Sequence, residues 1–267
     1  MHSPRAESSP VACVIGDSLV NNLDAKTVGN ALKAEVVVAR AYTTFEEATE
    51  NEAQVAPKLP GRSFQKVTDD SLKNNESELL ILQAGAADIT NFKTKDKSAN
   101  QYREYFKQQT VIAAKNMITV ATNSLINYPS LKQVIIMKQV PRYDAISVDP
   151  LGTKASLAQL YNDTLVELKS KSSYGSEILI CNHNLDCSGG IREARYKSKH
   201  RFDGVHLFGS SGSKAFTESI LMALKEADLV KNTPLSHFRR YHMKYNQSPQ
   251  YSVSTHNRFD ALNQENY

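Results

Sequence analysis

Short apolar runs recur along the chain at intervals that suit the strands of a buried sheet. Each is four or five residues long, is rich in Val, Ile or Leu, and lacks strict alternation with polar residues. This pattern is typical of parallel strands that are covered on both faces. The runs are Val11–Ile15, Val36–Ala39, Leu79–Leu82, Val134–Met137 and Ile178–Cys181.

Segments with a helical spacing of apolar residues lie between these runs. Apolar positions recur every three or four residues from Tyr102 to Ile126, from Leu157 to Leu168 and from Phe216 to Ala227. A further helix is expected through Leu23 and Leu32. Strands that alternate with helices form right-handed βαβ units. The sequence therefore predicts an α/β fold, a three-layer α/β/α sandwich with a five-stranded parallel sheet.

One domain is expected between residues 11 and 230. A chain of 267 residues is long enough for one substantial core. Residues 1–10 are polar and contain two prolines, and we expect a disordered N-terminal tail. From Lys231 onward the chain is rich in Asn, Gln and Ser and has no helical period. Residues 231–267 are therefore expected to form a poorly ordered, polar and basic tail.

Composition indicates the cellular location of the protein and says little about its function. No apolar stretch approaches 18 residues, so no membrane span is expected. The first ten residues lack the apolar segment of a secretory signal, which favours an intracellular, cytoplasmic location. Cys13, Cys181 and Cys187 are an odd count, which argues against a disulfide framework. A net charge of +4 permits an anionic partner without requiring one.

Two short motifs, far apart in the chain, complement each other chemically. Gly16-Asp17-Ser18-Leu19 follows the first predicted strand, and Asp203-Gly204-Val205-His206 follows the last one after a long loop. A serine hydroxyl is a weak nucleophile until a histidine accepts its proton and a carboxylate orients that histidine. Because the carboxyl ends of parallel strands share one edge of a sheet, the two motifs are expected to meet there.

Each motif also has an ordinary structural explanation. Asp and Ser are common helix caps, so Gly-Asp-Ser can be a turn that starts a helix. An Asp-x-x-His sequence on a protein surface is unremarkable. Their joint position at the carboxyl edge favours Ser18, His206 and Asp203 as a catalytic triad.

Together these residues resemble the SGNH, or GDSL, hydrolase superfamily over residues 11–230. The resemblance implies a three-layer α/β/α fold and cleavage of small-molecule, sugar or lipid esters without a metal or organic cofactor. It makes Ser18 the nucleophile, His206 the base and Asp203 its orienting acid. Asp17 would help to fix the serine turn.

The middle blocks of that family pattern are altered in this chain. Ala41 stands where the family has a glycine whose N–H enters the oxyanion hole, and it keeps an N–H. The third block, Gly-x-Asn-Asp in the family, is Gly85-Ala86-Ala87-Asp88. Asp88 is retained, but Ala87 cannot supply the side-chain amide. Loss of such a donor costs about 10²–10³ in rate elsewhere, unless Asn91 or Arg40 substitutes.

A finer resemblance concerns possible nucleic-acid association. Val140-Pro141-Arg142-Tyr143-Asp144 and the stretch 257–263 are similar to SGNH esterase-like domains of animal genomes, often within mobile elements. Basic residues cluster between Arg192 and Arg201, and again around Arg239 in the tail. Such runs are usually solvated, but they can contact nucleic acid weakly.

Other chemistries fit less well. Cys181, His183 and Cys187 lie within seven residues, but their spacing matches no common zinc pattern. Neither a phosphate-binding Gly-rich loop nor a Gly-x-Ser-x-Gly elbow is present. The sequence thus predicts an SGNH-type serine esterase, and the alternative is a catalytically degenerate SGNH domain that binds RNA or protein.

Overall fold

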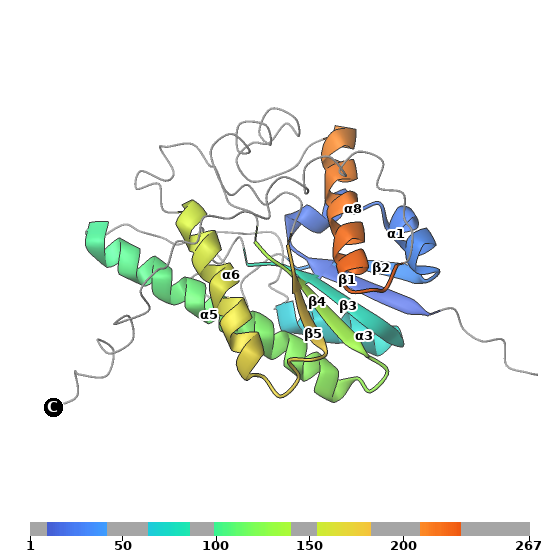
Figure 1. Ribbon diagram of the computed structural model, residues 1–267, viewed down its shortest axis with the longest axis horizontal. Coiled ribbons are helices and arrows are strands. Elements are labelled where there is room, and N and C mark those ends of the chain that lie inside the picture. Colours follow the sequence, from blue (N-terminus) through green and yellow to red (C-terminus); the bar gives the residue numbers. More distant parts are fainter. Residues whose placement is uncertain (1–9, 42–63, 86–98, 140–153, 183–208, 231–267) are drawn as a thin grey trace, which may run out of the picture. The chain divides into compact units, whose positions relative to one another are not determined.

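The computed structural model describes residues 10–41, 64–85, 99–139, 154–182 and 209–230 (Figure 1). The chain divides into two units, Met1–Thr233 and Pro234–Tyr267, and all described residues belong to the first. The two predicted tails lie outside the described residues, apart from Pro10. Their predicted disorder stays a prediction.

Five parallel strands form one sheet, as predicted. They are β1 (Val11–Gly16), β2 (Glu35–Arg40), β3 (Ser77–Gln83), β4 (Gln133–Met137) and β5 (Ile178–Cys181). The strand order is β2-β1-β3-β4-β5, so β1 lies inside the sheet between β2 and β3. In this register Gly16 lies between Arg40 and Gln83 at the carboxyl end of the sheet.

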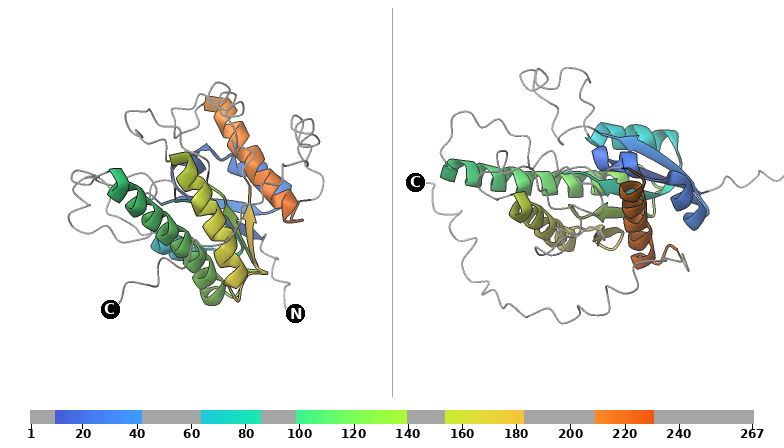
Figure 2. Two further views of the ribbon diagram at one scale, coloured as in Figure 1. Left: turned by 60° about the vertical axis from the view of Figure 1, so that its left-hand side comes forward. Right: turned by 90° about the horizontal axis from the view of Figure 1, so that it is seen from above.

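Helices cover both faces of the sheet (Figures 1 and 2). The described elements are η1 (Ser18–Asn22), α1 (Ala25–Leu32), α3 (Phe64–Asn74), α5 (Ala99–Asn127), α6 (Lys154–Lys171) and α8 (Gly209–Glu226). Helices α3, α5 and α6 pack on one face, where α5 and α6 lie side by side, and α1 and α8 contact each other on the opposite face. The predicted three-layer α/β/α architecture is confirmed.

The inner strands β1, β3 and β4 carry apolar runs whose two faces are buried, whereas the edge strand β2 is only partly buried and exposes Val38. In β3, Leu80 and Leu82 join the core under α3, α5 and α6, whereas Ile81 belongs to the other face. All three side chains are fully buried. Burying one large aliphatic side chain contributes about 1.5–3 kcal/mol, so these short strands make up much of the core.

Two helical segments differ from the sequence prediction. The helix expected through Leu23 and Leu32 is two elements, η1 and α1, separated at Asp24, whose carboxylate caps α1 by accepting the Thr27 N–H at 3.1 Å. Helix α3 was not predicted, because only Phe64, Val67 and Leu72 mark its apolar face. The three long helices were predicted within a few residues of their ends, except that α8 starts seven residues before Phe216.

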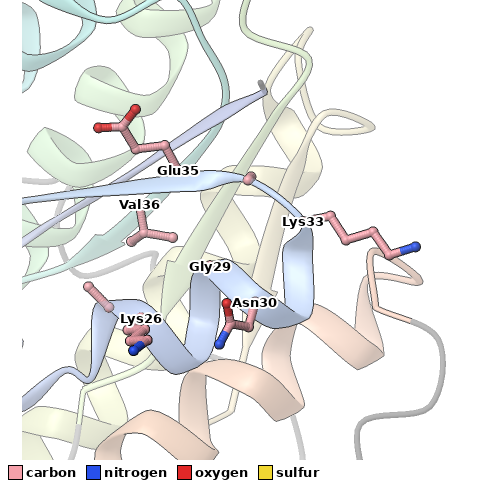
Figure 3. Close-up of a pocket in the computed structure, with 8 residues that line it drawn as sticks. Lys26, Gly29, Asn30, Lys33, Glu35 and Val36 are labelled. Atoms are coloured by element: carbon pink, nitrogen blue, oxygen red, sulfur yellow. The ribbon is translucent and has the colours of Figure 1, made fainter. Parts of the chain in front are cut away.

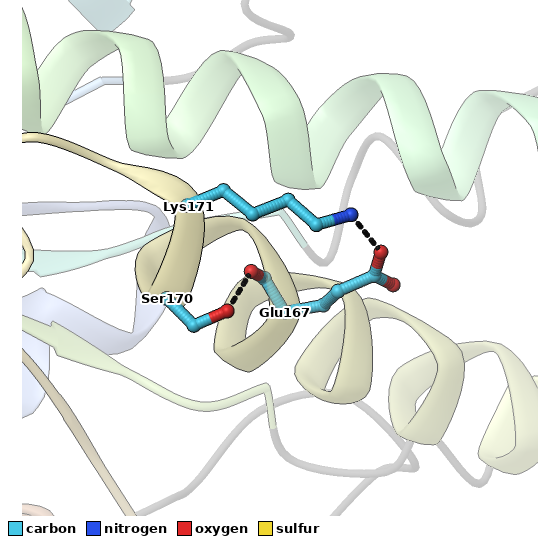
Figure 4. A network of polar contacts seen from close by, with 3 residues as sticks. All are labelled: Glu167, Ser170 and Lys171. Atoms are coloured by element: carbon cyan, nitrogen blue, oxygen red, sulfur yellow. Dashed lines mark hydrogen bonds and ion pairs between the residues drawn. The ribbon is translucent and has the colours of Figure 1, made fainter.

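The exposed end of α6 carries a surface ion pair that contributes little to the stability of the helix. Lys171 Nζ lies 2.5 Å from Glu167 Oε1, and the Ser170 hydroxyl donates to the Glu167 carbonyl at 2.6 Å (Figure 4). Exposed pairs of this kind contribute about 0–1 kcal/mol. The helix is held mainly by its buried face, which includes Leu157, Tyr161 and Leu165.

None of the helices within the described ranges combines the length and the apolar character that crossing a bilayer requires.

Candidate active site

The turn after β1 is built on a close approach that only glycine allows. A Cβ atom on Gly16 would lie 2.3 Å from the Gln83 carbonyl oxygen and 2.4 Å from Val20 Cγ1. Directly after it, the Asp17 N–H donates to the same Gln83 oxygen at 2.9 Å. The chain is therefore held tightly against the end of β3 just before Ser18.

Ser18 starts the short helix η1 at the carboxyl end of β1. Asp17 is its N-cap, and the Asp17 carboxylate accepts the Leu19 N–H at 2.9 Å. The Ser18 side chain is half-buried, whereas Leu19 and Val20 are buried and anchor η1. As the first residue of η1, Ser18 has an N–H without a partner inside that helix. Asp17 thus fixes the serine turn by a direct hydrogen bond, as the resemblance implies.

Ala41 lies beside this turn, but its N–H is already engaged. It donates to the Gly16 carbonyl at 2.9 Å and so extends the ladder between β1 and β2 by one residue. Ala41 is also almost fully buried. In this arrangement the Ala41 N–H is hydrogen-bonded to the end of β1, and its contribution to an oxyanion hole stays a prediction.

The third block begins at Gly85, whose φ of +115° is a conformation that glycine adopts readily and other residues rarely. Ala87 and Asp88 lie outside the described residues, as does Asn91. Arg40 is described: it ends β2, is half-buried and pairs with Gly16 in the sheet register. Its role as a substitute for the missing amide remains a prediction.

Asp203 and His206 lie outside the described residues, but the helix that follows them is tied to the serine turn. The Ser213 hydroxyl of α8 donates to the Asn22 carbonyl of η1 at 2.7 Å. One turn later, Thr217 Oγ1 accepts the Asp24 N–H at 2.9 Å. Because His206 precedes Gly209 by three residues, their Cα atoms are at most about 11 Å apart.

Two buried glutamines at the same edge of the sheet were missed from the sequence. Gln83 ends β3, and Gln139 follows β4 by two residues; both side chains are at least 96% buried. Gln139 and Tyr161 both donate to the Ala84 carbonyl, immediately before Gly85. The available signal was a polar residue at the end of a fully apolar strand.

A surface hollow elsewhere on this unit is not part of the site. It is lined by α1, by Lys33 and Ala34 just after this helix, and by the start of β2 at Glu35 and Val36 (Figure 3). The Lys33 side chain extends away from it. Since the hollow lies at the amino end of β2, it is at the opposite edge of the sheet from Ser18.

The described cysteines are structural. Cys13 and Cys181 are buried free thiols, and burial raises the pKa of both, that of Cys181 to about 12. A protonated thiol is a poor metal ligand. No group of three or more His, Cys, Asp or Glu side chains suited to a metal ion occurs within the described ranges. His183 and Cys187 lie outside them, and so do the basic segments around Arg192–Arg201 and Arg239.

Comparison with known proteins gives a result at the level of the fold. Neither a family model nor a curated protein sequence matches this chain. Among solved structures, a GDSL-like lipase from Bacteroides thetaiotaomicron is similar with a TM-score of 0.52 and 14% identity, over 85% of this chain and 93% of that one. A carbohydrate acetylesterase from Sinorhizobium meliloti gives 0.54 and 15%, over 82% and 99% respectively.

An aryl esterase from M. smegmatis is similar with a TM-score of 0.54 and 13% identity, over 83% of this chain and 100% of that chain. These matches extend over nearly the whole length of each known structure, so they concern the complete sheet and its helices. They do not test the resemblance to esterase-like domains of mobile elements, because the motifs that carry it lie outside the described residues. This chain has the fold of the SGNH, or GDSL, hydrolases.

Proposed function

We propose that this protein is a serine esterase that cleaves carboxylic esters through an acyl-enzyme intermediate on Ser18. The main support for the proposal is that α8 and the segment from η1 to Asp24, which are far apart in the sequence, are joined by hydrogen bonds. Ser18 begins η1, and the helix that follows His206 is hydrogen-bonded to η1 and to the residue before α1. This contact supports a meeting of His206 with the Ser18 hydroxyl.

In the proposed reaction, Ser18 Oγ attacks the ester carbonyl carbon while His206 accepts the hydroxyl proton. The tetrahedral intermediate collapses, the alcohol leaves with that proton, and the acyl group remains on Ser18. Water then attacks the acyl-enzyme, with His206 again as base, and the acid is released. Asp203 holds the imidazole in the required tautomer and stabilises its charged form.

Stabilisation of the oxyanion is the weak part of this site. The Ser18 N–H is suitably placed at the start of η1, but the Ala41 N–H is bound to the Gly16 carbonyl. Ala87 has no side-chain amide. Since each missing donor costs about 10²–10³ in rate, we expect a slow esterase.

Ester chemistry as the substrate class is supported by the similar structures, which include a lipase, a carbohydrate acetylesterase and an aryl esterase. The proposed substrate is a small-molecule, sugar or lipid ester, and no metal or organic cofactor takes part.

The proposal is tested with a short activated ester. Hydrolysis by the purified protein is expected to disappear in Ser18→Ala and to fall steeply in His206→Ala and Asp203→Asn. Ser170→Ala is the matched control, because Ser170 lies at the exposed end of α6. Activity that survives Ser18→Ala in a folded sample contradicts the mechanism.

The second candidate is a degenerate SGNH domain that binds RNA or protein. The engaged Ala41 N–H and the missing amide at Ala87 favour it. Binding through the basic residues between Arg192 and Arg201 is then expected to weaken steeply as salt rises. Absence of hydrolysis together with salt-sensitive binding of single-stranded RNA would support this candidate over the esterase.

A further inference from the structure

A buried polar network surrounds the carbonyl of Ala84 at the carboxyl end of β3. The Tyr161 hydroxyl of α6 donates to this oxygen at 3.0 Å, and the Gln139 amide donates to it from the loop after β4. Tyr161 is fully buried and Gln139 is 4% exposed. One backbone oxygen therefore receives two side-chain donors from two elements that are distant in sequence.

The Tyr161 ring also packs against the next residue, Gly85. A Cβ atom on Gly85 would lie 2.8 Å from Tyr161 Cζ and 2.9 Å from its hydroxyl oxygen. Gly85 has a φ of +115°. The ring and the hydroxyl of Tyr161 thus hold the backbone at the point where the chain leaves β3.

Gln139 is itself held from α6. Its N–H donates to Asn162 Oδ1 at 2.7 Å, and Asn162 Nδ2 donates to the Gln139 carbonyl at 3.1 Å. Within the described part of the chain, the buried Gln139 Oε1 accepts no hydrogen bond. A buried, unsatisfied acceptor costs about 1–3 kcal/mol in typical proteins, so an apolar residue of the same length would serve stability better. Such local conflicts are expected where a residue serves function.

The position of this network gives it a consequence for the proposed reaction. Gly85 is the first residue of the third block, and this block lacks the asparagine amide at position 87. Without that side chain, the block can contribute to an oxyanion hole only through main-chain groups. Their usefulness depends on the direction of the backbone, because donors act well only when they are already placed.

We propose that Tyr161 and Gln139 are positioning residues that clamp the Ala84 carbonyl and so fix the Gly85 turn for catalysis. This inference rests on the proposed esterase function, which it deepens. Neither residue touches the reacting atoms. Both act by holding the backbone at Ala84 and Gly85, the point where the third block begins.

The first test compares two hydroxyl deletions. Tyr161→Phe removes the clamp and keeps the ring. Tyr128→Phe is the matched control, because the Tyr128 hydroxyl also donates to a backbone carbonyl, that of Asp69 at 3.1 Å, near the opposite edge of the sheet. We expect kcat to fall roughly tenfold in Tyr161→Phe with KM unchanged, as for a small misplacement of catalytic groups. Tyr128→Phe is expected to keep wild-type kinetics.

The second test separates positioning from stability. Gln139→Met removes the donor together with the unsatisfied oxygen, and the Ala84 carbonyl keeps Tyr161. If Gln139 serves only stability, the Gln139→Met variant is expected to have a lower unfolding midpoint than the wild type. A positioning role predicts an unchanged or higher midpoint with a lower kcat. The double variant is expected to lose more than the product of the single losses, because the carbonyl then has no side-chain donor.

Amide hydrogen exchange gives a readout that does not depend on activity. Exchange in the segment from Gln83 to Ala87 is expected to be faster in Tyr161→Phe and Gln139→Met than in the wild type and Tyr128→Phe. Unchanged exchange in this segment overturns the clamp, whatever the kinetics. Faster exchange with unchanged kcat overturns its catalytic role. If the wild type shows no hydrolysis, the proposed function and the catalytic role of the clamp are both refuted. The hydrogen-exchange result then tests only whether Tyr161 and Gln139 hold the backbone.

Discussion

At the scale of single residues, Ser18 owes its position to the two residues before it. Gly16 lets η1 fold back against the end of β3, and Asp17 binds the Leu19 N–H. Both roles require these residue types, because a Cβ at position 16 would overlap the Gln83 carbonyl and an uncharged, non-polar residue at position 17 could not cap the helix. The proposed nucleophile is therefore held by local geometry that the motif itself encodes.

Buried Cys181 gives a prediction for stability against pH. Burial, with a smaller contribution from the Glu226 carboxylate, raises the pKa of this thiol to about 12. In the unfolded chain the thiol loses its proton near pH 8.5, so the unfolded state binds fewer protons than the folded state above that pH. Stability from this group is therefore complete below about pH 8.5 and is lost as the pH rises toward 12.

The measurement is urea unfolding of the wild type and Cys181→Ala between pH 8 and 10.5. The wild type is expected to lose up to about 1.4 kcal/mol per pH unit more than the variant once the unfolded thiol ionises. Parallel pH profiles of the two proteins would show that the buried thiol does not set this dependence.

Residues whose role depends on their sequence neighbours were predicted. Residues whose role depends on contacts between different strands and helices were missed. Asp17 and Ser18 follow directly from one motif beside an apolar run. Gln139 and Tyr161 meet at the Ala84 carbonyl only because β3, β4 and α6 converge there. No spacing in the sequence encodes that meeting. The engaged N–H of Ala41 likewise depends on the register of β1 with β2.

At the scale of elements, α8 connects the two ends of the proposed site. Its first half is bound to the segment between η1 and α1 through Ser213 and Thr217, which lie one helical turn apart. The sequence predicted the apolar stripe of this helix but not its first turns, because Gly209–Lys214 contains no apolar residue. Ser213, which makes one of the two contacts, lies in these polar turns.

Thr217 offers a test of this contact. Thr217→Val keeps the shape of the side chain but removes the acceptor for the Asp24 N–H, which is expected to cost about 1–3 kcal/mol. Thr217→Ser keeps the hydroxyl and is the matched control. We also expect slower labelling of Ser18 by a fluorophosphonate in Thr217→Val, since His206 precedes this helix.

The labelling rate is compared at a urea concentration well below either unfolding transition. Equal stability and equal labelling in Thr217→Val and Thr217→Ser would contradict the role of α8 as a connector. A loss of stability without slower labelling would show that the contact between Thr217 and Asp24 stabilises the fold but does not affect the reactivity of Ser18.

At the scale of the whole molecule, the buried layers were predictable and the surface was not. Five apolar runs that lack alternation mark the five strands of the sheet, and the inner strands β1, β3 and β4 are buried on both faces. Helix α3 escaped prediction because three apolar residues suffice to pack it against β1 and β2. The strand order β2-β1-β3-β4-β5 could not be predicted, because right-handed crossovers limit the possible orders without selecting one.

The division of the chain at Thr233 predicts that the last 34 residues do not support the fold. Truncation after Thr233 keeps Val230, which is buried. Since every buried residue of the described unit precedes the cut, the melting temperature is expected to change by only about 2–4 °C at most, the equivalent of about 1 kcal/mol. A large drop in melting temperature or in solubility would show that the tail docks on the sheet unit.

The central claim is that Ser18 is an activated nucleophile, and covalent labelling tests it most directly. The full chain is treated with a fluorophosphonate, digested and analysed by mass spectrometry, with Ser18→Ala and Ser170→Ala treated alongside. The account predicts one modified serine, Ser18, with labelling lost in Ser18→Ala, retained in Ser170→Ala and strongly slowed in His206→Ala. A folded wild-type protein that remains unlabelled at Ser18, or that is labelled equally well without His206, would contradict it.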